Sequence, residues 1–433
     1  MEYPILKMAI EILRNYALCD SCLGRQFAML GYKLTNRDRG RSIKVTLLMD
    51  AEASNDIDTI RILSSRGMLP EASAVLQRRG MLHHEQQVCF VCGGIFDRLQ
   101  EIASRIVNTV FGYEFDSFIL GVVVPGWVSE REDRVRLISG STYCEDIKSE
   151  LSRELGKLLA SMLKVRFDPV RPDLNIVVDP FSMMVEVSPT PIYIAGRFRK
   201  FKTGFPIRSK LCRVCMGRGC DSCGGLGVRE ISVEYALMKV AMDLYGCESV
   251  KLHLQIDDGR DRVVLGLGRS FILEVRKPKR RSVDLTIFRE KLYSMFEGLI
   301  DVGELAYTDR KSICQMKASF EPEGYILRLR PMEPVDMVEA IKHLKRLEGL
   351  KIKQRYPGFK PRLKTISNLS LQIVDDRSVE VRFTSSEPLH TKSFIEGGRD
   401  TKPTIMEVTG VAWLPVDTIV YVGGMKHAQL ERV

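Results

Sequence analysis

The sequence predicts an α+β protein of several domains, and three observations support this fold class. The chain has 433 residues, enough for roughly two to four domains that each bury their own core. Apolar residues in the first part of the chain recur at helical spacing, whereas later segments alternate in the manner of strands. Eight of the eleven cysteines form four Cys-x-x-Cys pairs, which is typical of small metal-stabilised elements.

The first predicted region covers residues 1–100 and is helical. Residues 1–16 carry apolar side chains at helical spacing, with Lys7 and Glu11 between them. This pattern indicates an amphipathic core helix, because a secretory signal needs a longer uncharged stretch. Short amphipathic segments continue through residues 36–82. No apolar run reaches the length of a membrane helix, so we expect a cytoplasmic protein with no membrane partner.

The second predicted region covers residues 101–205 and mixes strands with a long helix. Phe118–Val124 is short and apolar, as expected for a buried strand. Tyr143–Leu163 has apolar residues on one helical face, which predicts a long helix. Further strands are predicted for Leu174–Asp179, Met184–Val187 and Pro189–Arg197. The last of these strands carries a basic tail and ends the region.

The Cys-x-x-Cys pairs are the strongest chemical pattern in the chain. Two residues between thiolates let both sulfurs face one ion from a tight turn, and two such pairs complete a tetrahedral zinc site. Two pairs fall in a glycine-rich segment, residues 206–230, which predicts a zinc knuckle. The other two pairs would bring distant segments to a second ion. The predicted ligands are Cys19, Cys22, Cys89, Cys92, Cys212, Cys215, Cys220 and Cys223.

Disulfides and thioredoxin-like redox motifs are the alternatives for these pairs. Disulfides fit poorly because the chain shows no secretory signal, and a redox motif usually occurs once, after a strand. Four thiolates around each ion leave no coordination position for a catalytic water. The predicted zinc is therefore structural.

The net charge of +10 is gathered in three basic clusters. One charge run is usually a solvated face, but three runs with Phe198, Phe201, Tyr356 and Phe359 among them favour a surface that follows phosphates. No helix-turn-helix pattern for a DNA major groove appears, so RNA is the expected ligand. The predicted RNA-binding residues are Arg197, Arg199, Lys200, Lys202, Arg276, Lys277, Lys351, Lys353 and Arg355.

The last predicted region, residues 231–433, is a mixed sheet-and-helix domain. Val233–Tyr245 is expected to be a helix, and Gly266 and Gly268 indicate a tight hairpin between two short strands. No phosphate-binding loop, dinucleotide fingerprint or Ser-His-Asp constellation is present. The predicted strands are Val263–Leu267, Phe271–Val275, Tyr325–Leu329, Leu369–Val374, Glu380–Thr384 and Thr418–Val422.

Five stretches together carry a resemblance to a known family. They are Cys19–Phe27, Cys89–Gly94, Pro191–Lys200, Leu265–Pro278 and Gly397–Ile405, with the knuckle Cys-x-x-Cys-x-Gly-x-Gly-Cys-x-x-Cys in addition. In this order they resemble the archaeal tRNA pseudouridine synthases that modify uridines 54 and 55 of the TΨC arm. The resemblance covers nearly the whole chain.

The resemblance implies a zinc-bound helical region with a THUMP-like RNA-binding domain, a four-cysteine knuckle, and a pseudouridine-synthase-like domain built on a mostly antiparallel sheet. Such a synthase releases uracil from its ribose at N1 and rejoins it through C5. This isomerisation requires no organic cofactor, so structural zinc is the only expected cofactor. The expected partner is tRNA, and no obligate protein partner is evident.

The resemblance also places a catalytic aspartate. The family shows Gly-Arg-Glu-Asp-x-Asp before the Leu-Gly-x-Gly-Arg segment, whereas this chain reads Asp257 to Arg262 as Asp-Asp-Gly-Arg-Asp-Arg. Aligned on Gly-Arg, Asp261 takes the first aspartate position after the loss of one residue; aligned without a gap, it takes the second. Asp261 is therefore the predicted catalytic residue, with Asp258 as the next candidate. Without the resemblance, Asp261 would be read as a loop residue paired with a neighbouring arginine.

Four predicted substrate-binding residues follow from the same resemblance. Tyr325 matches the tyrosine expected to stack on the target uracil, although a tyrosine on a strand is otherwise a common core residue. His390 stands where the family usually has a second substrate-contacting tyrosine, while Lys392 keeps the basic group and Arg260 precedes the aspartate. These departures leave two interpretations open, an active synthase or a catalytically weakened tRNA-binding protein that keeps the fold.

Overall fold

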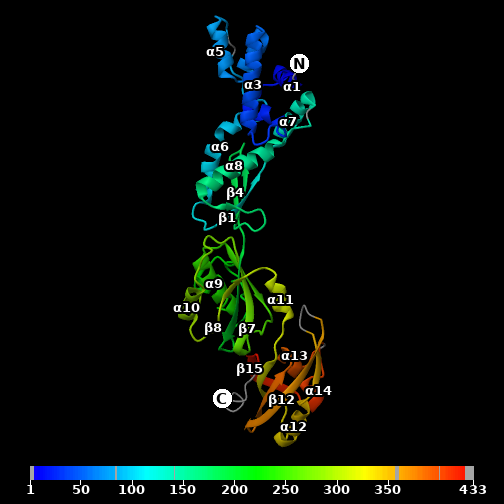
Figure 1. Cartoon of the computed structure of the whole chain (residues 1–433). Coiled ribbons are helices and arrows are strands. Elements are labelled where there is room, and N and C mark those ends of the chain that lie inside the picture. Colours follow the sequence, from blue (N-terminus) through cyan, green and yellow to red (C-terminus); the bar gives the residue numbers. More distant parts are fainter. Residues whose placement is uncertain (1–3, 83–84, 141, 356–359, 399, 425–433) are drawn as a thin grey trace. The chain divides into compact units, whose positions relative to one another are not determined.

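The computed structural model of the protein (Figure 1) describes residues 4–82, 85–140, 142–355, 360–398 and 400–424. The chain divides into two compact units, Met1–Thr190 and Pro191–Val433, called unit 1 and unit 2 below. Tyr356 and Phe359, two aromatic residues of the predicted RNA surface, lie outside the described residues. Within the described part of the chain, no helix is long and apolar enough to cross a membrane.

Unit 1 combines helices with a small sheet. The sheet has four strands in the order β2-β1-β3-β4, in which β1 pairs in parallel with both β2 and β3, and β3 pairs antiparallel with β4. The strands are β1 (Ser117–Val122), β2 (Arg166–Phe167), β3 (Leu174–Asp179) and β4 (Met184–Pro189). The helices are α1 (Pro4–Asn15), α2 (Asp20–Arg25), α3 (Asn36–Ala53), α4 (Ile57–Ser65), α5 (Pro70–Arg78), η1 (Ile95–Arg98), α6 (Leu99–Val110), α7 (Gly126–Ser139) and α8 (Ile147–Leu163).

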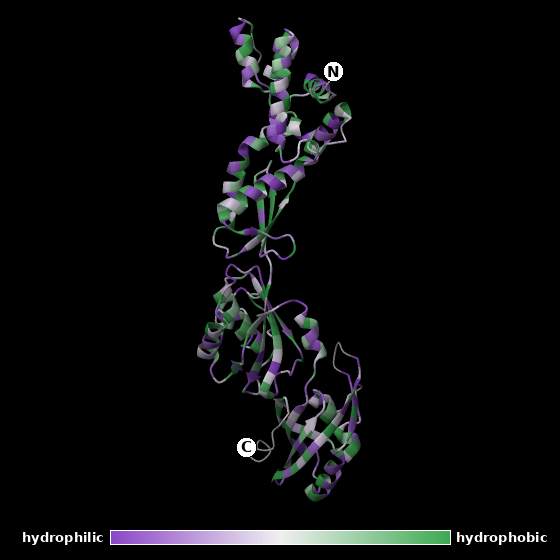
Figure 2. Cartoon of the chain, in the orientation of Figure 1, coloured by the Kyte–Doolittle hydropathy of each residue, from purple (hydrophilic) through white to green (hydrophobic). Residues whose placement is uncertain are grey.

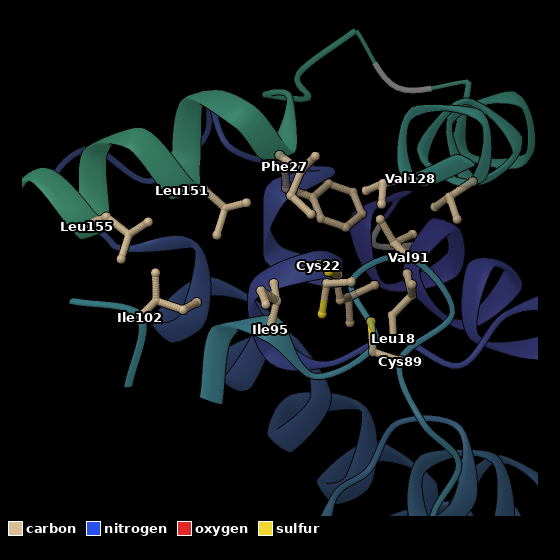
Figure 3. Packing of buried hydrophobic residues seen from close by; sticks show 14 of the residues in the cluster. Leu18, Cys22, Phe27, Cys89, Val91, Ile95, Ile102, Val128, Leu151 and Leu155 are labelled. Carbon is tan, nitrogen blue, oxygen red and sulfur yellow. The ribbon is translucent and has the colours of Figure 1, made fainter. Parts of the chain in front are cut away.

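One hydrophobic core joins the helical and the sheet-containing parts of unit 1. Figure 3 shows Cys22 and Cys89 packed among apolar side chains, including Leu18, Val91 and Ile95. The long predicted helix at Tyr143–Leu163 begins only at Ile147, because the Asp146 side chain accepts the Ser149 N–H at 2.7 Å and caps the helix there.

Unit 2 is organised by an eleven-stranded sheet. Its main path is β14-β11-β12-β13-β10-β15-β7-β5-β8, with β6 paired to β7 and β9 paired to β5. Among the described strands of this sheet, only the β15–β7 pairing is parallel, which confirms the predicted mostly antiparallel sheet. The strands are β5 (Ile192–Lys200), β6 (Ser249–Leu254), β7 (Val263–Arg276), β8 (Ile300–Val302), β9 (Ala306–Thr308), β10 (Glu323–Pro331), β11 (Lys351–Gln354), β12 (Arg362–Asp375), β13 (Ser378–Ser385), β14 (Thr401–Lys402) and β15 (Trp413–Val422).

Two separate cores cover this sheet on either side of the β15–β7 pair. One core packs α9 and α10 on β5, β6 and β7, and the other packs α12, α13 and α14 on β10 to β13 and β15. In Figure 2 the helices carry hydrophobic and hydrophilic residues along their lengths, as expected for elements that bury one face. The helices are η2 (Asp221–Cys223), α9 (Val233–Tyr245), α10 (Leu285–Phe296), α11 (Ser312–Ala318), α12 (Met337–Leu344), η3 (Lys345–Leu347), α13 (Thr391–Glu396) and α14 (Ile405–Thr409).

The strand β5 differs from the prediction that it closes the second region. It pairs along its length with β7, and therefore belongs to the sheet of unit 2. Phe198 on this strand is fully buried against Phe271 rather than exposed for stacking on RNA bases. The division between the units falls just before the strand, after Thr190.

The predicted hairpin around Gly266 and Gly268 is wrong, because β7 is one continuous strand of 14 residues. Both glycines have positive φ angles, +70° and +82°, and bend the strand without ending it. A Cβ atom at Gly266 would lie 2.5 Å from the Val422 carbonyl oxygen, and one at Gly268 would lie 2.7 Å from that of Phe198. Glycine is thus required where β7 passes between its two neighbours.

Candidate active site

A cleft of about 610 Å³ in unit 2 collects most of the residues predicted for the active site. One side is the loop of residues 257–262 that leads into β7, and the other is formed by α13 with the residue before it and by the first half of β15. The cleft thus lies beside the parallel β15–β7 pair, between the two cores of the unit. Asp261, Arg260, His390 and Lys392 all line it.

Of the three aspartates on the cleft loop, Asp258 and Asp261 lie in opposite environments. Asp261 is exposed and lines the cleft. Asp258 is only 3% exposed, and its two oxygens accept hydrogen bonds from Arg269 Nε at 2.7 Å and Nη2 at 2.8 Å. Burial alone would raise the pKa of Asp258, but Arg269 holds this pKa below 3.8, and the charges of Arg262 and Lys200 lower it further. Of these two candidates, Asp261 is therefore the accessible carboxylate and Asp258 a structural one.

Lys200 is not placed as predicted for an RNA contact. The side chain is fully buried, and its ammonium donates to the carbonyl oxygens of Phe205 at 2.7 Å, Arg260 at 2.9 Å and Gly259 at 3.2 Å. Burial lowers the pKa of Lys200 to about 8. Its three donors are engaged by main-chain oxygens, so the residue supports the turn that presents Asp261 instead of binding phosphate.

His390 lies on the opposite side of the cleft and caps α13. Its Nδ1 accepts the Ser393 N–H at 3.2 Å, so in the neutral ring the proton resides on Nε2. Burial lowers the pKa of His390 below 6.5, assisted by the positive charges of Arg262 and Lys364. His390 therefore contributes a neutral imidazole with an N–H donor.

The two predicted cations of the cleft are held less tightly than these buried groups. The Lys392 side chain is 70% exposed, and its Nζ lies 3.8 Å from a Glu396 carboxylate oxygen. Arg260 donates to the Gly204 carbonyl oxygen at 3.1 Å and lies 3.4 Å from Glu230 Oε2. Both charges can meet an anion entering the cleft, because their present contacts are long or at the surface.

Tyr325 is buried beneath the cleft and does not line it. The side chain is 1% exposed, and its ring stacks on Phe383 with centroids 5.2 Å apart. The hydroxyl donates to Glu323 Oε2 and accepts the Leu389 N–H at 2.6 Å. In this structure, the tyrosine thus supports the segment that precedes His390, and stacking on a base would require it to move.

The predicted RNA-binding residues differ in their surroundings. Arg197 donates to both carboxylate oxygens of Glu321, and Arg276 donates to Glu274 at 2.8 Å. Lys351 and Lys353 are exposed on β11, on the face opposite the buried Ile352. The others are Arg199, which lies 3.5 Å from Asp301; Lys277, which lies 2.6 Å from Glu248; and Lys202 and Arg355, both exposed.

The cysteines gather in two clusters, each of which could hold a metal ion. In unit 2 the Sγ atoms of Cys212 and Cys220, and those of Cys215 and Cys223, lie 3.9 Å apart. Tetrahedral zinc bound at about 2.3 Å separates its sulfur ligands by about 3.8 Å, whereas a disulfide needs about 2.0 Å. The donor set and its spacing therefore fit a four-thiolate metal site and exclude disulfides.

Backbone amides support the thiolates of this cluster. The Cys215 Sγ accepts the Gly219 N–H at 3.2 Å, and the Cys223 Sγ accepts those of Cys220 and Gly227 at 3.3 Å. Such bonds stabilise negative charge on sulfur, as a metal-binding knuckle requires.

The second cluster brings together Cys19, Cys22, Cys89 and Cys92 in unit 1. The Sγ atoms of Cys19 and Cys92 lie 3.7 Å apart, although the residues are 73 positions apart in the chain. The predicted pairing of distant segments is confirmed in its geometry. Arg25 lies beside this cluster, since its Nη2 donates to Cys22 Sγ at 3.5 Å.

Comparison with known families matches both units. The archaeal Pus10 THUMP domain matches residues 102–179, and the C-terminal domain of Pus10 matches residues 193–419. The chain belongs to the Pus10 family. The predicted family and the prediction of an enzyme, an isomerase, are confirmed, because this is a family of pseudouridine synthases.

Relatives of the Pus10 family align over nearly their full length. The proteins named tRNA pseudouridine synthase Pus10 from Thermofilum pendens and Methanothrix thermoacetophila are 32% and 31% identical, covering 94% and 99% of this chain and 93% and 97% of their own. The protein of that name from Methanopyrus kandleri is 33% identical over 93% of this chain and 94% of its own.

Sequence reasoning missed the buried polar residues that support the cleft. Arg269 and Glu323 are each 1% exposed, and Gln354 and Lys364 are also buried beneath His390. Arg269 lies in the Leu-Gly-x-Gly-Arg stretch, but the carboxylates that it meets are 11 and 54 residues away. The only signal was a charged residue within an otherwise apolar strand pattern.

Proposed function

We propose that this protein is a tRNA pseudouridine synthase that isomerises uridine 54, uridine 55 or both in the TΨC arm. The observation that carries this proposal is the exposed Asp261 carboxylate in a cleft of unit 2, flanked by cations and by a neutral imidazole. Membership of the Pus10 family supports tRNA as substrate, and we expect the protein to act in the cytoplasm.

The isomerisation breaks the bond between N1 of uracil and C1′ of ribose and forms a bond between C5 and C1′. N1 gains a proton and C5 loses one, so nothing is consumed and no organic cofactor is needed. A target base must leave its stack to react, and the cleft volume of about 610 Å³ is within the usual range of ligand sites.

Asp261 supplies the carboxylate that acts on the flipped nucleotide. Asp258 fits this role less well, because both of its oxygens are taken by the buried Arg269. His390 would donate from Nε2 to a uracil carbonyl, and Lys392 and Arg260 would contact the neighbouring phosphates. Tyr325 would support the base only after rearrangement, since it is buried beneath Leu389.

We also propose that both cysteine clusters hold Zn²⁺ as a structural ion. All eight sulfurs are placed for two four-thiolate sites. Zinc would tie the α2 segment to residues 89–92 in unit 1 and would close the knuckle in unit 2.

Unmodified tRNA transcripts labelled with tritium at C5 of uridine test the reaction directly, because isomerisation releases this hydrogen. The wild type should release tritium, and chemical mapping should place pseudouridine at position 54 or 55. Asp261→Asn should bind tRNA as the wild type does and release only background tritium, since the amide keeps the size but lacks the negative charge.

Asp258→Asn is the matched comparison three residues away. It should lower stability and keep measurable activity. Full activity of Asp261→Asn would transfer the catalytic role to another carboxylate. A wild type that binds tRNA but forms no pseudouridine on any transcript would favour the weakened tRNA-binding protein instead.

Binding of tRNA should depend strongly on salt because exposed cations meet phosphates. Lys351→Gln with Lys353→Gln should reduce the slope of log Kd against log salt by about 0.7–0.9 for each phosphate that the protein no longer neutralises. Lys239→Gln, an exposed α9 lysine that lies 3.3 Å from Asp243, is the control expected to leave the slope unchanged. Equal slopes for the double variant and the wild type would exclude β11 from the RNA surface.

A further inference from the structure

A continuous line of buried polar side chains runs beneath the cleft from one side to the other. It begins at Asp258 on the loop that carries Asp261, continues through Arg269 and Glu323, and ends at Tyr325 beside Leu389. Each of the four side chains is at most 3% exposed. The two loops at the ends of this line are 128–131 residues apart in sequence, as the numbers of Leu389, Asp258 and Asp261 give.

Each link in the line is a direct hydrogen bond. Arg269 donates to both oxygens of Asp258, at 2.7 and 2.8 Å, and its third nitrogen donates to Glu323 Oε1. The other oxygen of Glu323 accepts the Tyr325 hydroxyl, which in turn accepts the Leu389 N–H at 2.6 Å. The residue after Leu389 is His390, which lines the cleft.

The charges along the line make its geometry stiff. One guanidinium lies between two carboxylates that water does not reach, so any separation takes from a buried charge its main partner. Burial alone would lower the pKa of Arg269, but Asp258 and Glu323 raise it well above its ordinary value. The bidentate contact with Asp258 fixes direction as well as distance.

The far end of the line is held from a second side. Gln354 Nε2 donates to the His390 carbonyl oxygen at 3.1 Å, and Gln354 Oε1 accepts the His390 N–H at 2.8 Å. Lys364 Nζ donates to Gln354 Oε1 at 2.8 Å and to the Pro388 carbonyl oxygen. Residues 388–390 are therefore a rigid segment, so a displacement of Tyr325 would be transmitted to the His390 main chain.

We infer that Arg269, Glu323 and Tyr325 are positioning residues that fix the Asp261 loop relative to the His390 segment across the cleft. The consequence for catalysis rests on the proposed function, whereas the mechanical link stands on the contacts alone. The Tyr325 hydroxyl connects the last two links of this line, because it donates a hydrogen bond to Glu323 and accepts one from the Leu389 N–H.

Amide hydrogen exchange of the full chain tests the link without requiring activity. Tyr325→Phe keeps the ring that stacks on Phe383 and removes the hydroxyl that connects Glu323 to Leu389. Gly259 follows Asp258 at the other end of the line, and its N–H donates to the Asp257 side chain. The Tyr325→Phe substitution should speed exchange at Gly259 about tenfold or more. Glu323→Gln should do the same, and Asp258→Asn should speed exchange at Leu389 and His390.

A matched control is Tyr245→Phe in the same unit. Tyr245 is fully buried and its hydroxyl meets that of Tyr307 at 2.9 Å, outside the line. The Tyr245→Phe substitution should change amide exchange near Tyr307 and leave the exchange rates of Gly259 and Leu389 as in the wild type.

Single-turnover kinetics at saturating protein test the consequence for catalysis. Tyr325→Phe and Glu323→Gln should each lower the rate of pseudouridine formation about ten- to a hundredfold, with the Kd for tRNA nearly unchanged, because small misplacements of catalytic groups are costly. The double variant should be no slower than the slower single variant, because both substitutions break one line.

Three results separate the possibilities. Exchange effects confined to the neighbourhood of each substitution would overturn the link. Lower melting temperatures with unchanged rates would overturn the positioning role, and so would rate losses that multiply in the double variant. A wild type without activity would refute the proposed function, while the exchange experiment would still decide whether the two sides are coupled.

Discussion

Each unit contains a fully buried arginine held by two carboxylates from distant elements. In unit 1, Arg25 donates to Glu132 and Glu150, both at 2.8 Å, and we call these three residues the Arg25 cluster. In unit 2, Arg269 bonds Asp258 and Glu323, and these form the Arg269 cluster. The arrangement is the same, but the Arg25 cluster adjoins the sulfur of Cys22 and the Arg269 cluster adjoins a cleft loop.

The role of a buried ion triad depends on which elements it connects. The Arg25 cluster joins α2 to α7 and α8, so it holds together the helices around a predicted metal site. The Arg269 cluster joins a loop to β7 and β10, and both of its ends lead to residues that line or support the cleft. Similar electrostatics thus stabilise a scaffold in one unit and a site in the other.

The largest expected effect is metal loss next to the Arg25 cluster. Cys22→Ser should lower the unfolding free energy of unit 1 by more than about 5 kcal/mol, since structural zinc contributes about 10–16 kcal/mol of apparent binding energy in small domains. Cys22 is fully buried in the core that fills this unit. Calorimetry should show a lower melting temperature for unit 1, and elemental analysis should find one zinc ion fewer per chain.

Cys212→Ser should have a local effect, because the knuckle cysteines form a small cluster separate from the main cores of unit 2. Proteolysis should open residues 206–230 while the transition of unit 2 moves little. Cys314→Ser, at an exposed thiol outside both clusters, is the control. If Cys212→Ser unfolded all of unit 2, the contrast between the clusters would be wrong.

Removal of the arginines should rank next in effect. Arg25→Met and Arg269→Met each remove the main cation between two buried carboxylates, so each should destabilise its own unit by about 3–5 kcal/mol. Below the melting transition, Arg269→Met should also slow pseudouridine formation, whereas Arg25→Met should leave the single-turnover rate unchanged. Urea unfolding and tritium release measure the two quantities separately, and equal rate losses would erase the distinction between scaffold and site.

Local patterns in the sequence predicted much of this fold. Val233–Tyr245 is a helix with the expected bounds, because Ser232 caps its start and Gly246 adopts a positive φ at its end. The Cys-x-x-Cys spacing likewise encodes each pair of ligands within one turn. Features that depend on distant partners were missed: β5 belongs to unit 2 through its pairing with β7, and β7 passes through two bends because β15 and β5 hold it on both sides.

The same distinction between local patterns and distant partners applies to the residues of the candidate site. Asp261 and His390 could be named from the resemblance, and the structure brings both to one cleft. The burial of Lys200 and Tyr325 could not be foreseen, because a basic tail and a strand tyrosine look alike whether they face solvent or core. The pairing of Arg269 with Glu323, 54 residues away, left no local pattern at all.

The smallest expected effect is a difference in pH dependence between the two clusters. Burial raises the pKa of Glu150 above 4.5, despite Arg25 and Asn36 and with help from Glu145. The folded state then holds this proton more tightly than the unfolded chain, so stability from Glu150 falls as pH rises above 4.5. Arg269, Arg262 and Lys200 keep the pKa of Asp258 below 3.8, so its contribution is complete above pH 3.8 and is lost on acidification through the lower folded pKa.

Glu150→Gln and Asp258→Asn isolate these contributions, because each amide keeps the shape and cannot titrate. Urea unfolding from about pH 3 to about pH 7 should give differences from the wild type with opposite slopes. The wild type should lose stability relative to Glu150→Gln as pH rises and gain stability relative to Asp258→Asn. Parallel slopes would mean that the two buried triads hold their carboxylates in the same way, and that only their connections set them apart.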